Sequence, residues 1–179
     1  MKKLISLFFL SILYNGIYSQ NLNTKNLSWR NIGPANMMGR IAAIDASNKD
    51  YRKVLIASAS GGIFKSDNAG VTWESIFDKY GAGSIGSVKF DQNDLNTIWV
   101  GTGESANRNS SAWGDGIYKS TDGGKTFSNM GLKSTHQIAE IEIHPNNSSI
   151  VYAAAVGHLW GYSGERGLFR TLDGGNSWE

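Results

Sequence analysis

Apolar and polar residues alternate along several short segments of this chain. An apolar side chain stands at about every second position in 40–44, 85–90 and 138–143. Such alternation is typical of a β-strand with one face in a core. Denser apolar runs, typical of strands buried on both faces, follow at 54–57, 98–100 and 151–154. The pattern predicts third strands at 62–65, 116–119 and 167–170, and a fourth strand at 73–76.

The same eight-residue motif follows each third strand. It reads hydroxyl-x-Asp/Asn-x-Gly-x-hydroxyl-aromatic and begins at residues 66, 120 and 171, so the copies are 54 and 51 residues apart. A period of roughly 40–50 residues with one turn motif per unit is typical of a propeller built from four-stranded blades. The sequence therefore predicts an all-β fold, a partial β-propeller of about three four-stranded blades that form the N-terminal part of a larger ring.

We expect the motif to form the tight turn between the third and fourth strands. Its central Asp or Asn can accept hydrogen bonds from N–H groups of its own turn. Its Gly supplies a position with positive φ, and its closing Trp or Phe can fill the space between neighbouring blades. The residues assigned this structural role are Ser66, Asn68, Gly70, Trp73, Ser120, Asp122, Gly124, Phe127, Thr171, Asp173, Gly175 and Trp178.

The N-terminal residues have the pattern of a secretory signal. Lys2 and Lys3 precede an apolar run from Leu4 to Leu13, and small residues follow before Gln20. The run is too short for a membrane span, and the alternative is a buried N-terminal helix. We predict a signal peptide at 1–19, a linker at 20–27, propeller blades at 28–179, and a secreted or periplasmic protein.

Residues 28–32 match the start of the fourth strand but lack a preceding turn motif. We expect this segment to close the ring as the outer strand of the last blade. The remaining blades are then expected C-terminal to Glu179, because a ring of this kind needs four to eight blades.

Composition excludes several classes of function. The formal net charge is +2, and it falls to zero without Lys2 and Lys3, so no basic surface for nucleic acid is expected. The chain has no cysteine and therefore no disulfide. Its three histidines have no metal-ligand spacing, and no phosphate-binding loop or nucleophile elbow is present. We expect no metal and no cofactor.

Two long polar insertions stand between second and third strands, at 104–115 and 157–166. In an up-and-down blade these loops share one end of the sheets with the connections between blades. Carboxylates, planar polar groups and aromatic rings together suit a peptide or glycan ligand. The candidate ligand-binding residues are Arg40, Glu104, Asn107, Arg108, Trp113, Asp115, His136, His158, Trp160 and Arg166.

A structural explanation of the insertions stays open. In that case Trp113 and Trp160 fold back onto their own loops, while Glu104, Arg108, Glu165 and Arg166 pair with one another at the surface.

The three motifs resemble the Asp-box, or BNR, repeat of sialidases, sortilin-type propellers, xyloglucan-degrading hydrolases and photosystem II assembly factors. From about Ser28 onward the chain is most similar to secreted bacterial proteins described as sortilin N-terminal domain or glycosyl-hydrolase-like. Stretches that carry this resemblance include Trp29–Pro34, Val100–Glu104, Trp113–Gly116 and Gly157–Gly161. Gly39-Arg40-Ile41-Ala42 stands where sialidases have Phe-Arg-Ile-Pro, and this departure disfavours sialidase activity.

Two functions follow from these observations. The first is a secreted module that binds a protein, peptide or glycan and does no chemistry. The second is a glycoside hydrolase, which needs two carboxyl groups across the scissile bond. Its candidates are Glu104, Asp115 and Glu165, the carboxyl groups of the two insertions.

Overall fold

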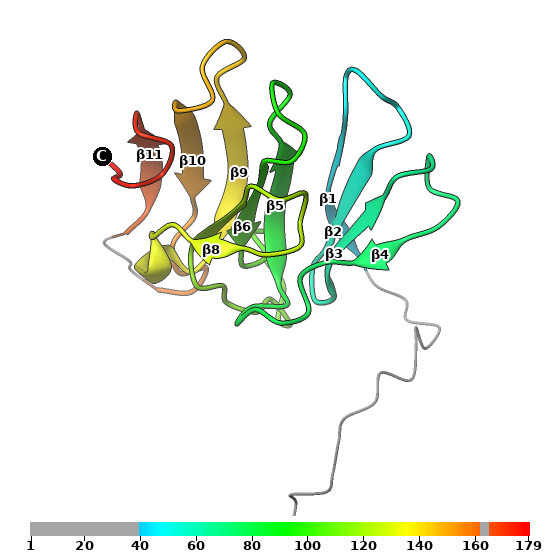
Figure 1. The fold of residues 1–179 in the computed structure, drawn as a ribbon. Coiled ribbons are helices and arrows are strands. Elements are labelled where there is room, and N and C mark those ends of the chain that lie inside the picture. Colours follow the sequence, from blue (N-terminus) through cyan, green and yellow to red (C-terminus); the bar gives the residue numbers. More distant parts are fainter. Residues whose placement is uncertain (1–39, 162–164) are drawn as a thin grey trace, which may run out of the picture. The chain divides into compact units, whose positions relative to one another are not determined.

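Three successive antiparallel sheets make up the computed structural model, which describes residues 40–161 and 165–179. Within these residues each sheet is a meander in which consecutive strands pair (Figure 1). The all-β fold predicted from the alternation is therefore confirmed. The predicted signal peptide, the linker and the strand at 28–32 lie outside the described residues.

The first two sheets have four strands each. The first contains β1 (Ile41–Ala46), β2 (Val54–Ser58), β3 (Gly62–Ser66) and β4 (Glu74–Ser75). The second contains β5 (Ile85–Phe90), β6 (Ile98–Thr102), β7 (Ile117–Ser120) and β8 (Ser128–Asn129). Each predicted strand in these sheets is present, with bounds that differ by at most two residues.

The third sheet has three strands in the described residues, β9 (Ile138–Ile143), β10 (Val151–Ala155) and β11 (Gly167–Thr171). Arg170 and Glu179 exchange two backbone hydrogen bonds, with N···O distances of 2.8 and 2.9 Å. Lys65 pairs with Glu74, and Lys119 with Ser128, at the same position of the other sheets. Glu179 therefore holds the position in the third sheet that the first residue of the fourth strand holds in the other two sheets.

The turn motifs lie at the same end of the sheets as the turns between first and second strands. In each sheet the fourth motif residue donates its N–H to a carbonyl of that turn, and the pairs are Ala69 with Arg52, Gly123 with Asn96, and Gly174 with Ser149. Figure 1 shows the β1–β2, β5–β6 and β9–β10 turns together at the upper end of the sheets. We call this end the turn side and the opposite end, with residues 59–61, 103–116 and 156–161, the insertion side.

Hydrogen bonds inside the motif explain its residue types. In the second copy the Ser120 Oγ accepts the Gly124 N–H at 2.9 Å and donates to the Asp122 Oδ1 at 2.8 Å. The Asp122 carboxylate accepts the Thr126 N–H at 2.9 Å and the Thr126 hydroxyl at 2.7 Å. Asp173 has the same partners in the third copy, Ser177 and Thr171. These hydrogen bonds hold the pKa of both carboxyl groups well below the usual range.

In the second and third copies the closing aromatic residue of the motif packs against an aromatic residue of the preceding unit. Phe127 lies edge-on to Phe77, which follows β4, with ring centroids 5.1 Å apart. Trp178 packs edge-on against Trp99 at 6.3 Å and donates its indole N–H to the Met130 carbonyl at 2.8 Å. Trp73, in the first sheet, is 40% exposed.

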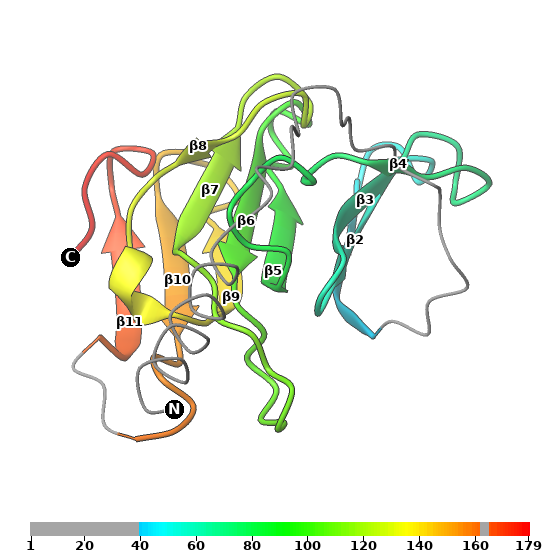
Figure 2. The same ribbon diagram turned by 90° about the horizontal axis from the view of Figure 1, so that it is seen from below.

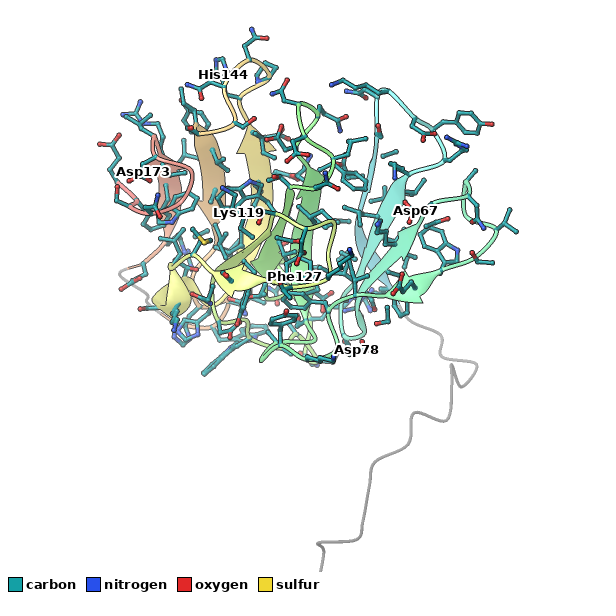
Figure 3. The ribbon with its side chains drawn as sticks, viewed as in Figure 1. Asp67, Asp78, Lys119, Phe127, His144 and Asp173 are labelled. Carbon is teal, nitrogen blue, oxygen red and sulfur yellow. The ribbon has the colours of Figure 1, made fainter. Side chains whose placement is uncertain are left out.

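A lysine also joins each sheet to the next. The Lys65 Nζ donates to the Gly123 carbonyl at 3.2 Å, and the Lys119 Nζ donates to the Gly174 carbonyl at 3.0 Å. Figure 3 labels Lys119 and Phe127, which belong to the second sheet. The contacts repeat because the units repeat.

The second sheet lies between the other two (Figure 2). Every residue of β6 is buried, whereas β1 has exposed Ile41 and Ile44. A strand is fully buried only where sheets cover both of its faces. None of the helices in the described residues has the length and hydropathy that a membrane span requires.

Candidate functional site

The first insertion, residues 103–116, is closed at its base by Ser84. The Gly103 N–H donates to the Ser84 carbonyl at 2.7 Å, and the Glu104 N–H donates to the Ser84 Oγ at 2.9 Å. The same hydroxyl donates to the Ala112 carbonyl at 3.1 Å. One buried serine therefore ties the start of the insertion to its end.

The far end of the insertion is attached to the third sheet. The Gly114 N–H donates to the His136 carbonyl at 2.7 Å, just before β9. Trp113 stands between this anchor and the Ala112 anchor, yet its side chain is 59% exposed. Its backbone is fixed while its indole faces solvent.

Asp115, predicted as a ligand-binding or catalytic residue, is engaged inside the fold. Its N–H donates to the Thr102 Oγ1 at 2.8 Å, and its Oδ2 accepts the Tyr118 hydroxyl at 2.6 Å. Its carbonyl accepts the Asn129 side-chain amide at 3.0 Å. Burial, and then the hydrogen bond to Asp115, raise the pKa of Tyr118. These contacts join the base of the insertion to β7 and β8.

Arg40 and Glu104 form an ion pair between the first and second sheets. Glu104 is 2% exposed, and within the described residues its Oε2 has no hydrogen-bond partner. Both residues line a pocket of about 230 Å³, which Arg108 also lines. The pocket combines two guanidinium groups with one buried carboxylate at the insertion side.

Three predicted site residues from different segments form an aromatic cluster. The Trp113 ring centroid lies 4.8 Å from that of His136 and 4.9 Å from that of His158. The two imidazole centroids lie 3.8 Å apart. Burial, and then the neighbouring His158, lower the pKa of His136, while Glu165 acts in the opposite direction. The two insertions therefore meet at one end of the sheets, as predicted from the topology.

Arg166 fastens the second insertion. Its Nε donates to the Val156 carbonyl at 2.6 Å, and its Nη2 donates to the His158 carbonyl at 2.8 Å. The nearby Trp160 is 61% exposed. Arg166 thus acts within its own loop, and Trp160 presents a second exposed indole on that loop.

The structure differs from the alternative explanation of the insertions at Trp113, Trp160 and Glu104. Trp113 and Trp160 remain more than half exposed, so neither is folded away into its loop. Glu104 pairs with Arg40, not with Arg108 or Arg166. Asn107 and Arg108 lie at the exposed tip, where the Arg108 N–H donates to the Ser111 Oγ at 3.2 Å.

Two residues of this end were not among the predicted site residues. Ser84 organises the first insertion, and Gln137 is fully buried with both side-chain amide atoms unpartnered in the described residues. The repeat contains a sequence pattern that could have identified both residues. Arg40, Ser84 and Gln137 each directly precede the first strand of a unit and are all polar.

A second pocket, of about 260 Å³, lies at the turn side. It is lined by Asp45 of β1, Lys89 of β5 and Glu142 of β9, and these are the first strands of the three sheets. The Lys89 Nζ lies 3.0 Å from the Glu142 carboxylate, and the Asp45 Oδ2 accepts the Phe90 N–H at 2.7 Å. Burial raises the pKa of Asp45 although this hydrogen bond opposes the shift. Lys89 and Glu142 therefore pair with each other across neighbouring sheets, and Asp45 binds the backbone of β5.

The described residues contain no group of three or more His, Asp or Glu side chains arranged to hold a metal ion.

Solved structures with a similar fold include GH74 enzymes and YCF48. An ancestral GH74 enzyme superposes with a TM-score of 0.64 and 23% identity, covering 79% of this chain and 18% of its own. The GH74 enzyme of Niastella koreensis has a TM-score of 0.60 and 22% identity, covering 76% and 20%. YCF48 bound to D1 peptide has a TM-score of 0.54 and 18% identity, covering 79% and 40%.

These similarities identify the fold as that of β-propeller blades. All three identities are low, so the comparisons show the fold and not the activity. The chain spans about a fifth of the length of the two GH74 enzymes and two fifths of YCF48. No protein-family model matches the sequence, and no curated protein sequence matches it.

Proposed function

We propose that this chain belongs to a secreted, sortilin-like propeller of the Asp-box type that binds a protein, peptide or glycan at its insertion side. The observation that carries the proposal is Trp113, which is 59% exposed although hydrogen bonds anchor the backbone on both sides of it. An exposed aromatic ring on a fixed backbone can bury area against a ligand without first losing much conformational freedom.

The surroundings of Trp113 support the same function. The cluster with His136 and His158 supplies flat apolar faces, and the pocket of Arg40 and Glu104 supplies charged hydrogen-bonding groups. Binding sites commonly combine an apolar lining with a few placed polar groups. YCF48, one of the structures with this fold, is bound to a peptide. Its likeness to this chain supports binding of a peptide by such blades.

The Asp-box assignment rests on the motif itself. In each of the three copies the first residue is a hydroxyl that accepts the N–H of the Gly four positions on. The central Asn or Asp accepts the N–H of the second hydroxyl residue, at 2.9 Å in every copy. Secretion is proposed from the basic and apolar pattern of residues 1–19.

A glycoside hydrolase is the second candidate, favoured by the buried Glu104 carboxylate with its unpartnered Oε2 beside a pocket. Glu165 would be the second carboxyl group, because Asp115 is held by Tyr118 and Thr102. Two GH74 enzymes share the fold. Hydrolysis requires both carboxyl groups to face one glycosidic bond.

The binding proposal is tested with Trp113→Ala in the full chain on a glycan array and a peptide library. Loss of a central aromatic contact costs about 2 kcal/mol, roughly a thirtyfold weaker affinity. Tyr51→Ala is the matched control, since Tyr51 is 78% exposed in the β1–β2 turn at the opposite end. Unchanged binding by Trp113→Ala, or equal loss in Tyr51→Ala, would contradict the proposal.

The same panel separates the two candidates. Wild-type protein is incubated with the bound glycans, and released sugar is measured beside Glu104→Gln. Binding without release supports the binding module. Release that disappears in Glu104→Gln, while binding persists, establishes the hydrolase instead.

A further inference from the structure

Two histidines from neighbouring segments lie ring against ring at the insertion side. The centroids of His136 and His158 are 3.8 Å apart with an interplanar angle of 54°. The Trp113 indole touches both rings, at 4.8 and 4.9 Å. Any change in the charge of this pair acts directly on the exposed tryptophan.

The backbones of both histidines are held in place. His136 has a φ of 58° and a ψ of −43°, which a non-glycine residue rarely adopts, and its carbonyl accepts the Gly114 N–H. The His158 carbonyl accepts the Arg166 Nη2. Strained backbone of this kind persists where its surroundings enforce it, often at functional positions. The rings can therefore separate by rotation of a side chain or by movement of one of the two loops.

The charges around the pair are few. His158 and Glu165 act on His136 electrostatically, in opposite directions, and the Arg166 guanidinium lies against the backbone of His158. The first insertion contributes the uncharged Trp113 ring. A proton on His136 would place a cation against the His158 ring, with Glu165 as the nearby counter-charge.

We propose that the His136–His158 pair makes the ligand site acid-sensitive, because a proton gained by His136 weakens the ring contacts among His136, His158 and Trp113 and displaces the Trp113 indole. The inference rests on the binding function proposed above and adds its regulation. The ligand is bound while the His136 ring is neutral and is released as that ring gains a proton.

The direction of the pH effect follows from the packed state. Burial and His158 lower the pKa of His136 from its ordinary value of 6.5, so the packed cluster favours the neutral ring. The open state binds a proton more readily than the packed state. The stability of the packed cluster relative to the open state is greatest above about pH 7. It decreases as the pH falls below 6.5 and through the lowered pKa of His136.

The test is an NMR titration of the ligand-free protein, because the chain has three histidines in all. The third, His144, is exposed in the β9–β10 turn at the turn side (Figure 3), at the opposite end of the sheets from the pair. We expect His136 to titrate below its ordinary value of 6.5, and the Trp113 indole signal to move over the same range as His136. His158→Gln should raise the titration midpoint of His136, whereas His144→Gln should not.

Three results would overturn the inference: a His136 midpoint at or above 6.5, a midpoint unchanged by His158→Gln, or a Trp113 signal that does not respond to pH. No ligand is needed, so such a result leaves the proposed binding function standing. Conversely, a coupled titration together with unchanged ligand binding by Trp113→Ala removes the binding function and, with it, the proposed release.

Discussion

Asn68 shows what the central residue of the turn motif must do. Its Oδ1 accepts the Thr72 N–H at 2.9 Å, and its Nδ2 donates to the Thr72 hydroxyl at 2.8 Å. Asp122 makes the same two links to Thr126, with the direction of the hydroxyl bond reversed. An amide and a carboxylate are therefore interchangeable here, as a hydrogen-bonding role requires.

We predict that Asp122→Asn leaves the free energy of unfolding nearly unchanged at pH 7. In acid, the free energy of unfolding should decrease less in this variant than in the wild type. The hydrogen bonds lower the pKa of Asp122, so its stabilisation is complete above the unfolded value of about 3.9 and is lost as the pH falls toward the lowered pKa. Urea unfolding at pH 7 and pH 3 measures both effects. An acid loss in Asp122→Asn as large as in wild type would contradict this role.

At the scale of elements, each sheet is joined to the next by a repeated set of contacts. The glycine at the fifth motif position allows this approach. A Cβ at Gly175 would stand 2.6 Å from the Trp99 ring of the preceding sheet, and one at Gly124 would stand 2.8 Å from Ile76. Both glycines also have positive φ. The motif therefore needs glycine for two independent reasons, its backbone conformation and the neighbouring sheet.

We predict that Gly175→Ala destabilises the chain by more than the 1–2 kcal/mol that a left-handed backbone costs a residue with a Cβ. The additional loss comes from the contact with Trp99. Gly161→Ala is the matched control, because Gly161 has a φ of 92° against 100° for Gly175 and no atom within 4 Å of its Cβ position. Denaturant unfolding compares them, and equal losses would show that packing between sheets adds nothing.

Across the whole molecule, burial is greatest in the sheet with a neighbour on each side. All five residues of β6 are buried, whereas the burial of β1 is at most intermediate. Hydrogen bonds also link the first strands of neighbouring sheets, β1 with β5 and β5 with β9. The Asp45 carboxylate accepts the Phe90 N–H, and the Ser87 Oγ accepts the Ile141 N–H at 3.1 Å. Backbone N–H groups at the edge of one sheet thus donate to side chains on the first strand of the preceding sheet.

We predict that native-state hydrogen exchange is slowest in β5, β6 and β7. Amides exchange through local openings, and these cost most where buried contacts lie on both faces of a sheet. Mass spectrometry of exchanged peptides provides the measurement. Exchange from Ile41–Ala46 as slow as from Ile98–Thr102 would contradict the expectation.

The motif at residues 66, 120 and 171 and the alternation of apolar residues were sufficient to predict an all-β propeller fold, because both depend on near neighbours in the chain. Repetition then placed both insertions at one end of the sheets. The roles of individual residues were harder to predict from the sequence. Asp115 was a candidate for binding or catalysis, yet its carboxylate holds Tyr118, and nothing local to Asp115 reveals that partner.

The sequence by itself determined the strands, the turns and their order, since hydrogen bonds within a turn and alternation within a strand are local properties. Only the tertiary structure decided which side chains meet across sheets: Glu104 with Arg40, 64 residues earlier, and His136 with His158. Such contacts depend on how neighbouring sheets pack and on where each loop is anchored. For this chain, residues distant in the sequence therefore form the candidate site on a scaffold that local patterns specify.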